Sequence, residues 1–223
     1  MKNSVLHIES KSNNSFGTGF VIDFDAKGVY IVTCQHVIDD VEIPFIGGVK
    51  AEIMSKASFI DMAVLYVEIL NVKPLSLQVD SCNSLEVEVI GFSHFSKSMS
   101  QKKHISASLY KKMIELHAND SNEFYDVRKI KAYDGFDFDR GNSGSPVICK
   151  STNKVIAMVS NKDGHDIAYA INIENIEKVW KSMPNALLLK SKNLDIGKNS
   201  LKKDFLSFML IFSMIVGIYY FLI

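Results

Sequence analysis

The feature that most limits the possible folds of this chain is a series of short apolar segments separated by turn residues. The segments are rich in Val, Ile, Phe and Tyr, which favour pleated strands, and they follow one another at close spacing. This pattern indicates an all-β sandwich or pair of barrels rather than βαβ units. Asp25–Gly28 is typical of a hairpin loop between two of the strands. The predicted strands are Val5–Glu9, Gly19–Phe24, Val29–Cys34, Lys50–Met54, Met62–Ile69, Leu85–Phe92, Lys103–Leu109, Lys112–His117, Phe124–Tyr133, Pro146–Cys149, Lys154–Val159 and Ile167–Ile171.

Composition excludes several classes of protein. With 223 residues, 47% of them hydrophobic and 22% charged, the chain is long enough for two small lobes and too apolar to be disordered. The formal net charge is zero, which argues against a nucleic-acid partner because phosphate binding leaves a basic footprint. Cys34, Cys82 and Cys149 are odd in number and lack metal-ligand spacing. We therefore expect no disulfide framework and a reducing compartment.

The end of the chain is an uncharged apolar run. Phe205–Ile223 spans 19 residues, close to the ~20 that cross a bilayer as a helix. Lysines precede it and none follows, so positive charge predicts that the globular part faces the cytoplasm. The N-terminus lacks the apolar core of a secretory signal. We expect a single-pass C-terminal membrane anchor; the alternative is a buried terminal helix of the globular part.

The same patterns predict how the chain is divided. Ile176, Val179, Trp180 and Met183 recur at helical spacing, which predicts a helix that Pro184 ends. A polar stretch in the middle of the chain is typical of a connection between lobes. The expected parts are an N-terminal β-barrel lobe (1–92), an inter-lobe connection (93–103), a C-terminal β-barrel lobe with its helix (104–184), a basic juxtamembrane linker (185–204) and a transmembrane helix (205–223).

One turn carries the strongest chemical signal. Gly141-Asn142-Ser143-Gly144-Ser145-Pro146 presents a hydroxyl and backbone N–H groups, as acyl transfer requires. His36 ends a predicted strand and Asp61 precedes another, so they are candidates for a base and the carboxylate that orients it. Each segment alone also fits an ordinary loop, a structural histidine or a capping carboxylate.

Taken together, four segments are more specific than any one of them. In chain order they are Gly17-Thr18-Gly19-Phe20, Thr33-Cys34-Gln35-His36-Val37, Asp61-Met62-Ala63-Val64-Leu65 and Gly141–Pro146. They resemble the chymotrypsin-like (trypsin-like) serine peptidases, especially the bacterial glutamyl-endopeptidase and Deg-type branch, across residues 5–183, and the His, Asp, Ser order agrees. The resemblance implies two six-stranded antiparallel β-barrels with the active site between them.

The resemblance also implies a role for each site residue. Ser143 would attack a peptide carbonyl, His36 would take and return its proton, and Asp61 would orient the imidazole. The backbone N–H groups of Gly141 and Ser143 would form the oxyanion hole. Asn142 stands where animal members carry the aspartate used in zymogen activation, so we expect control from elsewhere. No cofactor is implied, and Cys34 with His36 lacks the further ligands of a zinc site.

Substrate preference is open between two readings. Asp137, six residues before Ser143, is implied to form the floor of the S1 pocket, where a carboxylate favours Lys or Arg at P1. Ser160 and Asn161 are implied to form the facing wall, with the Ser160 carbonyl binding the substrate backbone. His165 offers a rival reading, an acidic P1 residue. A solvated acidic loop around Asp137 is the plainer alternative.

These observations predict a membrane-tethered serine endopeptidase that cleaves protein or peptide substrates through an acyl-enzyme. One alternative is a catalytically silent trypsin-like module that binds a peptide or protein partner at the membrane. Another is a tail-anchored scaffold, although the apolar run has one glycine, Gly217, and no Gly-x-x-x-Gly pair. Neither the physiological substrate nor a regulatory partner is identified by the sequence.

Overall fold

Strands form most of the structure. The computed structural model describes residues 2–68, 72–79, 82, 84–96, 99–117 and 124–183. The described helices are short: η1 (Lys2–Ser4), α1 (Gln35–Val41), η2 (Ser58–Ile60), η3 (Ile173–Asn175) and α2 (Ile176–Val179). The strands are β1 (Val5–Glu9), β2 (Phe16–Phe24), β3 (Val29–Thr33), β4 (Phe45–Ile46), β5 (Val49–Lys50), β6 (Glu52–Ala57), β7 (Met62–Val67), β8 (Glu86–Ser96), β9 (Met99–His117), β10 (Phe124–Ala132), β11 (Pro146–Cys149), β12 (Lys154–Asp163) and β13 (Ile167–Asn172).

The first sheet is antiparallel and has the order β5-β4-β1-β2-β3-β7-β6. The loop between β2 and β3 confirms the predicted hairpin. Asp25 donates its N–H to the Gly28 carbonyl (3.0 Å), and its carboxylate accepts the N–H groups of Lys27 and Gly28. An aspartate that bonds the backbone just after it is a common way to close a turn.

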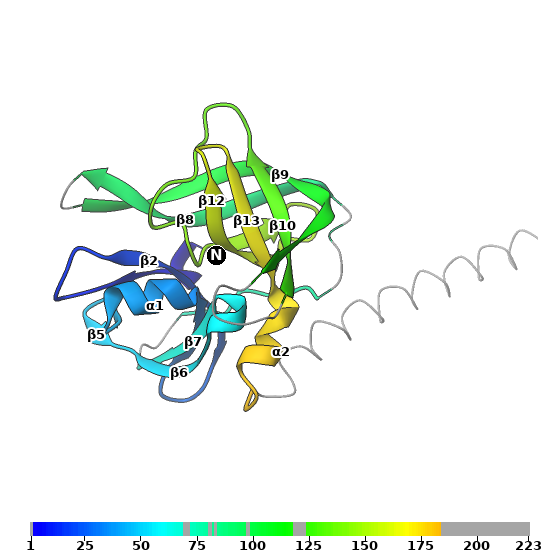
Figure 1. Ribbon diagram of the computed structural model, residues 1–223. Helices are drawn as coiled ribbons and strands as arrows, with labels where there is room; N and C mark the ends of the chain where they lie inside the picture. Colours follow the sequence, from blue (N-terminus) through cyan, green and yellow to red (C-terminus); the bar gives the residue numbers. More distant parts are fainter. Residues whose placement is uncertain are drawn as a thin grey trace, which may run out of the picture. The chain divides into compact units, whose positions relative to one another are not determined.

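The second sheet closes into a barrel with the order β10-β13-β12-β11-β8-β9. All four residues of β11 are buried, so this strand reads as one continuous apolar run. The barrel interior holds Val87, Ile105, Ile130, Phe138 and Val147. Figure 1 shows the barrel strands gathered on one side and the first sheet with α1 on the other.

The expected all-β fold with two sheets is confirmed. The expectation that both sheets close into barrels is only half right. The second sheet is a six-stranded barrel, whereas the first is an open sheet of seven strands. Alternating residues reveal strands, while closure depends on strand tilt and register between distant segments. The sequence analysis also missed β4 and merged Lys50 of β5 with part of β6 in the predicted strand Lys50–Met54. The strands β4 and β5 have two residues each and meet at Gly47 and Gly48.

The expected connection between the two sheets, residues 93–103, lies elsewhere in the fold. Its described residues, 93–96 and 99–103, belong to the hairpin of β8 and β9, where Phe92 pairs with Lys102 and Ser93 pairs with Gln101. Their polar composition is that of an exposed hairpin rather than of a linker. The chain passes between the sheets after Val67, and on the way Leu75 donates its N–H to the Val21 carbonyl at 2.8 Å.

The predicted terminal helix is present but short. It comprises η3 and α2 and ends at Val179, and the ring of the next residue, Trp180, lies 4.9 Å from the ring of Tyr30. The Ser55 hydroxyl donates to the Val179 carbonyl at 2.6 Å, so α2 packs on the first sheet. No helix among the described residues is long and apolar enough to cross a membrane. Pro184, the linker and Phe205–Ile223 lie outside them.

The expectation of unpaired cysteines is wrong. Cys82 and Cys149 form a disulfide, with their Cα atoms 5.9 Å apart and a separation of 67 positions in sequence. Cys82 packs against the barrel core, of which Cys149 in β11 is a member. Sequence spacing carries no information about such a pair, because the fold brings the two residues together. Cys34 is free and buried.

Candidate functional site

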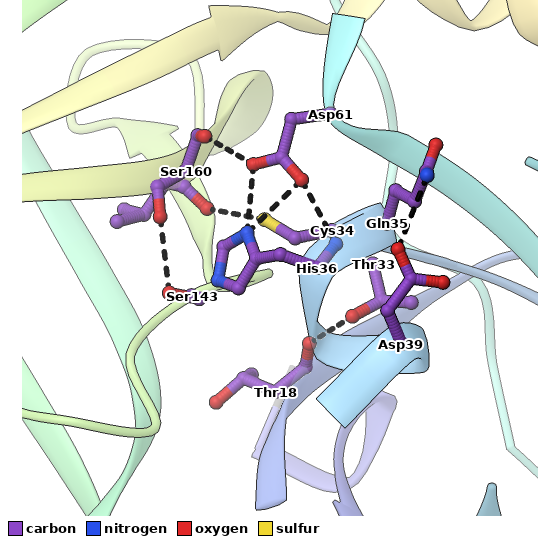
Figure 2. Close-up of polar contacts among 10 residues, drawn as sticks. Thr18, Thr33, Cys34, Gln35, His36, Asp39, Asp61, Ser143 and Ser160 are labelled. Atoms are coloured by element: carbon purple, nitrogen blue, oxygen red, sulfur yellow. Dashed lines mark hydrogen bonds and ion pairs between the residues drawn. The ribbon is translucent and has the colours of Figure 1, made fainter. Parts of the chain in front are cut away.

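His36, Asp61 and Ser143 come together where the two sheets meet (Figure 2). His36 is the second residue of α1, directly after β3. Asp61 follows η2 with φ 46° and ψ 48°, a left-handed conformation that aspartate tolerates better than most residues. Ser143 lies in the turn before β11. The first sheet thus contributes the imidazole and the carboxylate, and the second contributes the hydroxyl.

Asp61 holds His36 through two groups. The His36 Nδ1 atom lies 3.0 Å from Oδ1 and 2.9 Å from Oδ2 of Asp61, and the His36 backbone N–H donates to Oδ1 at 3.0 Å. A carboxylate at Nδ1 favours the tautomer with its proton on that atom. Nε2 is then left as the basic nitrogen of the neutral ring.

The environment shifts both pKa values. Burial opposes the protonation of His36, but the hydrogen bond and charge of Asp61 outweigh it, so the pKa of His36 lies above its ordinary 6.5. Burial likewise disfavours the Asp61 carboxylate, yet the bonds from His36 and Ser160 hold its pKa below the ordinary 3.8. Asp61 is therefore an anion near neutral pH, and the imidazole beside it binds a proton more readily than an ordinary histidine does.

Ser160 on β12 links the carboxylate to the serine (Figure 2). Its hydroxyl donates to Oδ2 of Asp61, and its carbonyl accepts the Ser143 hydroxyl at 3.0 Å. Sequence reasoning assigned Ser160 to substrate binding and missed its contact with Asp61. No local pattern signals that contact, since the two residues are 99 positions apart.

The turn before Ser143 leaves two backbone donors available. Asn142 donates its N–H to the Asp139 carbonyl at 3.2 Å, and Gly141 has φ +93°, as the third residue of a type II turn requires. A Cβ on Gly141 would lie 2.2 Å from the Phe16 ring. Within the described ranges, the N–H groups of Gly141 and Ser143 donate in none of the hydrogen bonds found.

Cys34 lies directly behind this arrangement. Its thiol is fully buried and donates to the Val159 carbonyl at 3.1 Å. Ligand atoms of Cys34, His36 and Asp61 lie within 4.8 Å of one another. Burial, with the nearby Asp61 charge, raises the pKa of the thiol well above its usual value, so it stays protonated. A protonated thiol and an Nδ1 atom bound to Asp61 do not suit a resident metal.

A cleft of about 660 Å³ opens beside His36 and Ser143. Its apolar walls are Phe16 and Val37, and its other lining residues are Asn14, Ser15, Asp40, His94, Arg140 and Gly141. The cleft gives an extended substrate access to the serine hydroxyl and to the free N–H groups. Sequence reasoning did not identify Phe16 or Arg140, because no motif marks a wall built by two sheets.

The residues predicted to set specificity lie outside this cleft. Asp137 is exposed, and its carbonyl accepts the Lys103 ammonium at 3.0 Å. Asn161 on β12 and His165 in the following turn are also exposed. The His165 carbonyl accepts the N–H of buried Phe138 at 2.7 Å, which brings the two predicted loops side by side. Their roles in substrate recognition stay predictions.

Comparisons with known proteins agree with this geometry. The family model for a trypsin-like peptidase domain matches residues 17–158. Two curated relatives, the serine protease HtrA-like proteins of two Staphylococcus epidermidis strains, are 27% identical over 212 residues. That match covers 84% of this chain and 34% of each relative, so the chain spans about a third of their length.

Solved structures show the same fold. The Rv3671c protease of Mycobacterium tuberculosis H37Rv, as an inactive serine-to-alanine mutant, has a TM-score of 0.65 and 22% identity, covering 82% of this chain and 89% of that one. Its active form also scores 0.65, with 21% identity and 79% of each chain covered. The serine endoprotease of Yersinia pestis scores 0.60 at 18% identity, covering 81% and 62%.

The fold and the site define a chymotrypsin-like serine peptidase. The chain belongs to the trypsin-like peptidase family, as residues 17–158 show. The resemblance to the Deg-type branch is supported by the HtrA-like relatives.

Proposed function

We propose that the chain hydrolyses peptide bonds through Ser143, His36 and Asp61. The observation that carries this proposal is the His36–Asp61 pair, with Nδ1 held at 2.9 Å from the carboxylate and Ser143 on the other side of the ring (Figure 2). A rotation about the Cα–Cβ bond of Ser143 moves its hydroxyl from the Ser160 carbonyl towards Nε2. The imidazole then accepts the proton as the oxygen attacks.

The remaining steps follow the same atoms. The carbonyl oxygen of the tetrahedral intermediate gains negative charge, and the N–H groups of Gly141 and Ser143 are free to stabilise it. His36 then gives its proton to the leaving amine, which leaves an acyl-enzyme on Ser143. Water, deprotonated by the same imidazole, releases the product acid and restores the serine.

A fluorophosphonate probe tests the proposal directly. We expect the wild-type chain to be labelled, the Ser143→Ala variant to remain unlabelled, and both to be equally folded. Ser145→Ala is the matched control, because Ser145 lies in the same turn and its buried hydroxyl has no partner among the described residues. A folded wild-type chain that neither reacts nor cleaves would instead favour a silent peptide-binding module.

Two alternative substrate preferences at P1 are proposed. Asp137 would favour a basic residue, and His165 would favour an acidic one. Lys162 on β12 donates to the Phe138 carbonyl at 3.3 Å, so positive and negative groups both border this loop. Profiling on a peptide library distinguishes the two readings, and a preference for neutral P1 residues would contradict both.

Membrane tethering is the last part of the proposal. It rests on the uncharged run Phe205–Ile223 and the lysines before it, which favour a single-pass anchor with the peptidase facing the cytoplasm. The silent module remains the alternative function, and it would use the same anchor.

A further inference from the structure

Thr18 on β2 is fully buried and bonds to both residues of the proposed oxyanion hole. Its hydroxyl donates to the Gly141 carbonyl at 2.7 Å, and its backbone N–H donates to the Ser143 carbonyl at 2.9 Å. One residue of the first sheet thus holds two peptide groups of the turn that leads into β11 of the second sheet. The hydroxyl oxygen also accepts the Phe92 N–H at 2.9 Å.

Asn142 completes the connection from the other side. It is 2% exposed, and its side-chain amide donates to the Phe92 carbonyl at 3.0 Å. Its side-chain oxygen accepts the Asp139 N–H at 2.7 Å, inside the turn that contains Gly141. Thr18, Phe92 and Asn142 therefore form one continuous hydrogen-bonded brace around that turn.

We propose that Thr18 and Asn142 are positioning residues that hold the oxyanion hole in its working shape. The inference rests on the proposed function, in which the Gly141 and Ser143 N–H groups stabilise the oxyanion. Donors fixed in advance stabilise developing charge without reorganising during the reaction. All bonds of the brace are made by groups within the folded chain, so the brace needs no newly formed N-terminus to hold the turn.

The contacts differ from ordinary packing because they depend on specific atoms. Thr18→Val keeps the shape of the side chain but removes the hydroxyl, which leaves the Gly141 carbonyl and the Phe92 N–H without that partner. Thr18→Ser keeps the hydroxyl and loses only a methyl group. Asn142→Asp keeps an acceptor for Asp139 but loses the donor to Phe92 and places a charge against its carbonyl.

The test compares these variants by kinetics and by the affinity of a peptide boronate, which mimics the tetrahedral intermediate. For Thr18→Val and Asn142→Asp, we expect kcat to fall about tenfold or more, boronate affinity to fall in parallel, and KM to change little. Thr18→Ser should stay close to wild type. The double variant should lose less than the product of the two single losses, because the residues act through one network.

Ser55→Ala is the matched control, since it loses an equally short hydroxyl-to-carbonyl bond far from the turn. The proposal is overturned if Thr18→Val keeps wild-type boronate affinity, or if Thr18→Ser loses as much as Thr18→Val. If Thr18→Val does not fold, Thr18→Ala and Asn142→Asp are judged by the same criteria.

Amide hydrogen exchange tests the brace without depending on catalytic activity, so it can fail or succeed independently of the proposed function. Exchange in the segment 139–144 should accelerate in Thr18→Val and Asn142→Asp, and not in Thr18→Ser or Ser55→Ala. If the wild-type chain fails to react at Ser143, the proposed function fails while the exchange result still decides whether the brace holds the turn. Unchanged exchange in both Thr18→Val and Asn142→Asp would refute the brace.

Discussion

His36 depends on Asp61 for its charge as well as its orientation. Because Asp61 raises the pKa of His36 above 6.5, the imidazole is neutral, and able to accept a proton, only above that raised value. We expect kcat/KM to fall with decreasing pH through a midpoint above 6.5. The measurement is the pH profile of kcat/KM on a short peptide.

The Asp61→Asn variant separates the two contributions. Without the carboxylate, burial lowers the pKa of His36, so the acid limb of the profile moves to lower pH. The wrong tautomer at Nδ1 should also lower kcat by about 10⁴-fold. NMR titration of the His36 ring checks the shift independently, and an unchanged midpoint would contradict the assigned cause.

Gly141 combines a backbone requirement with a steric one. In Gly141→Ala the methyl group meets the Phe16 ring, and φ +93° is unfavourable for alanine. Displacement of the Gly141 N–H should lower kcat by about 10²–10³-fold. Gly135→Ala is the control, because Gly135 has φ +85° with open space around it, and it should cost stability without lowering kcat. Equal kcat losses in both variants would contradict the oxyanion role.

At the scale of elements, the Cys82–Cys149 disulfide ties the crossing segment to β11. Closing a loop over 67 residues restricts the unfolded chain, so Cys82→Ser should lower the free energy of unfolding by about 2–4 kcal/mol. Urea unfolding measures the loss. Since the bond lies outside the cleft, kcat should not change, and a large fall in kcat would show that the crossing segment shapes the site.

The elements also show what the sequence could predict. Strands such as β1 and β11 were located within their observed bounds, because alternation and apolar runs are local signals. The candidate site was predicted differently, from the family resemblance of four short segments and from the chain order of His36, Asp61 and Ser143. Thr18 and Gly141 are 123 residues apart, and Ser160 and Asp61 are 99 apart, so their contacts arise only from register and closure. Local patterns do not encode those contacts.

At the scale of the whole molecule, the predicted anchor is the feature to test. A chain ending at Asp204 lacks Phe205–Ile223, so we expect it to leave the membrane fraction while the full chain stays there after a high-salt wash. Each folded molecule should keep its kcat on a soluble peptide. Retention of the shortened chain on membranes would contradict a single anchor.

The side of the membrane needs a separate measurement. The lysines before Phe205 favour the cytoplasm, whereas disulfides persist mainly in oxidising compartments. With cytoplasmic exposure, we expect Cys82 and Cys149 to be alkylated in cells without added reductant. Resistance to alkylation, together with cleavage by externally added protease, would place the domain on the opposite side.

The candidate site takes residues from both sheets, and this allows the peptidase to be divided into two inactive fragments. Every described strand of the first sheet precedes the crossing between β7 and β8, and every described strand of the barrel follows it. Cutting the chain there would yield two fragments, one with the imidazole and carboxylate and the other with the hydroxyl. Neither could perform the reaction alone, so turnover would report their association. This peptidase could therefore serve as a split reporter whose signal rises with the concentration of paired halves.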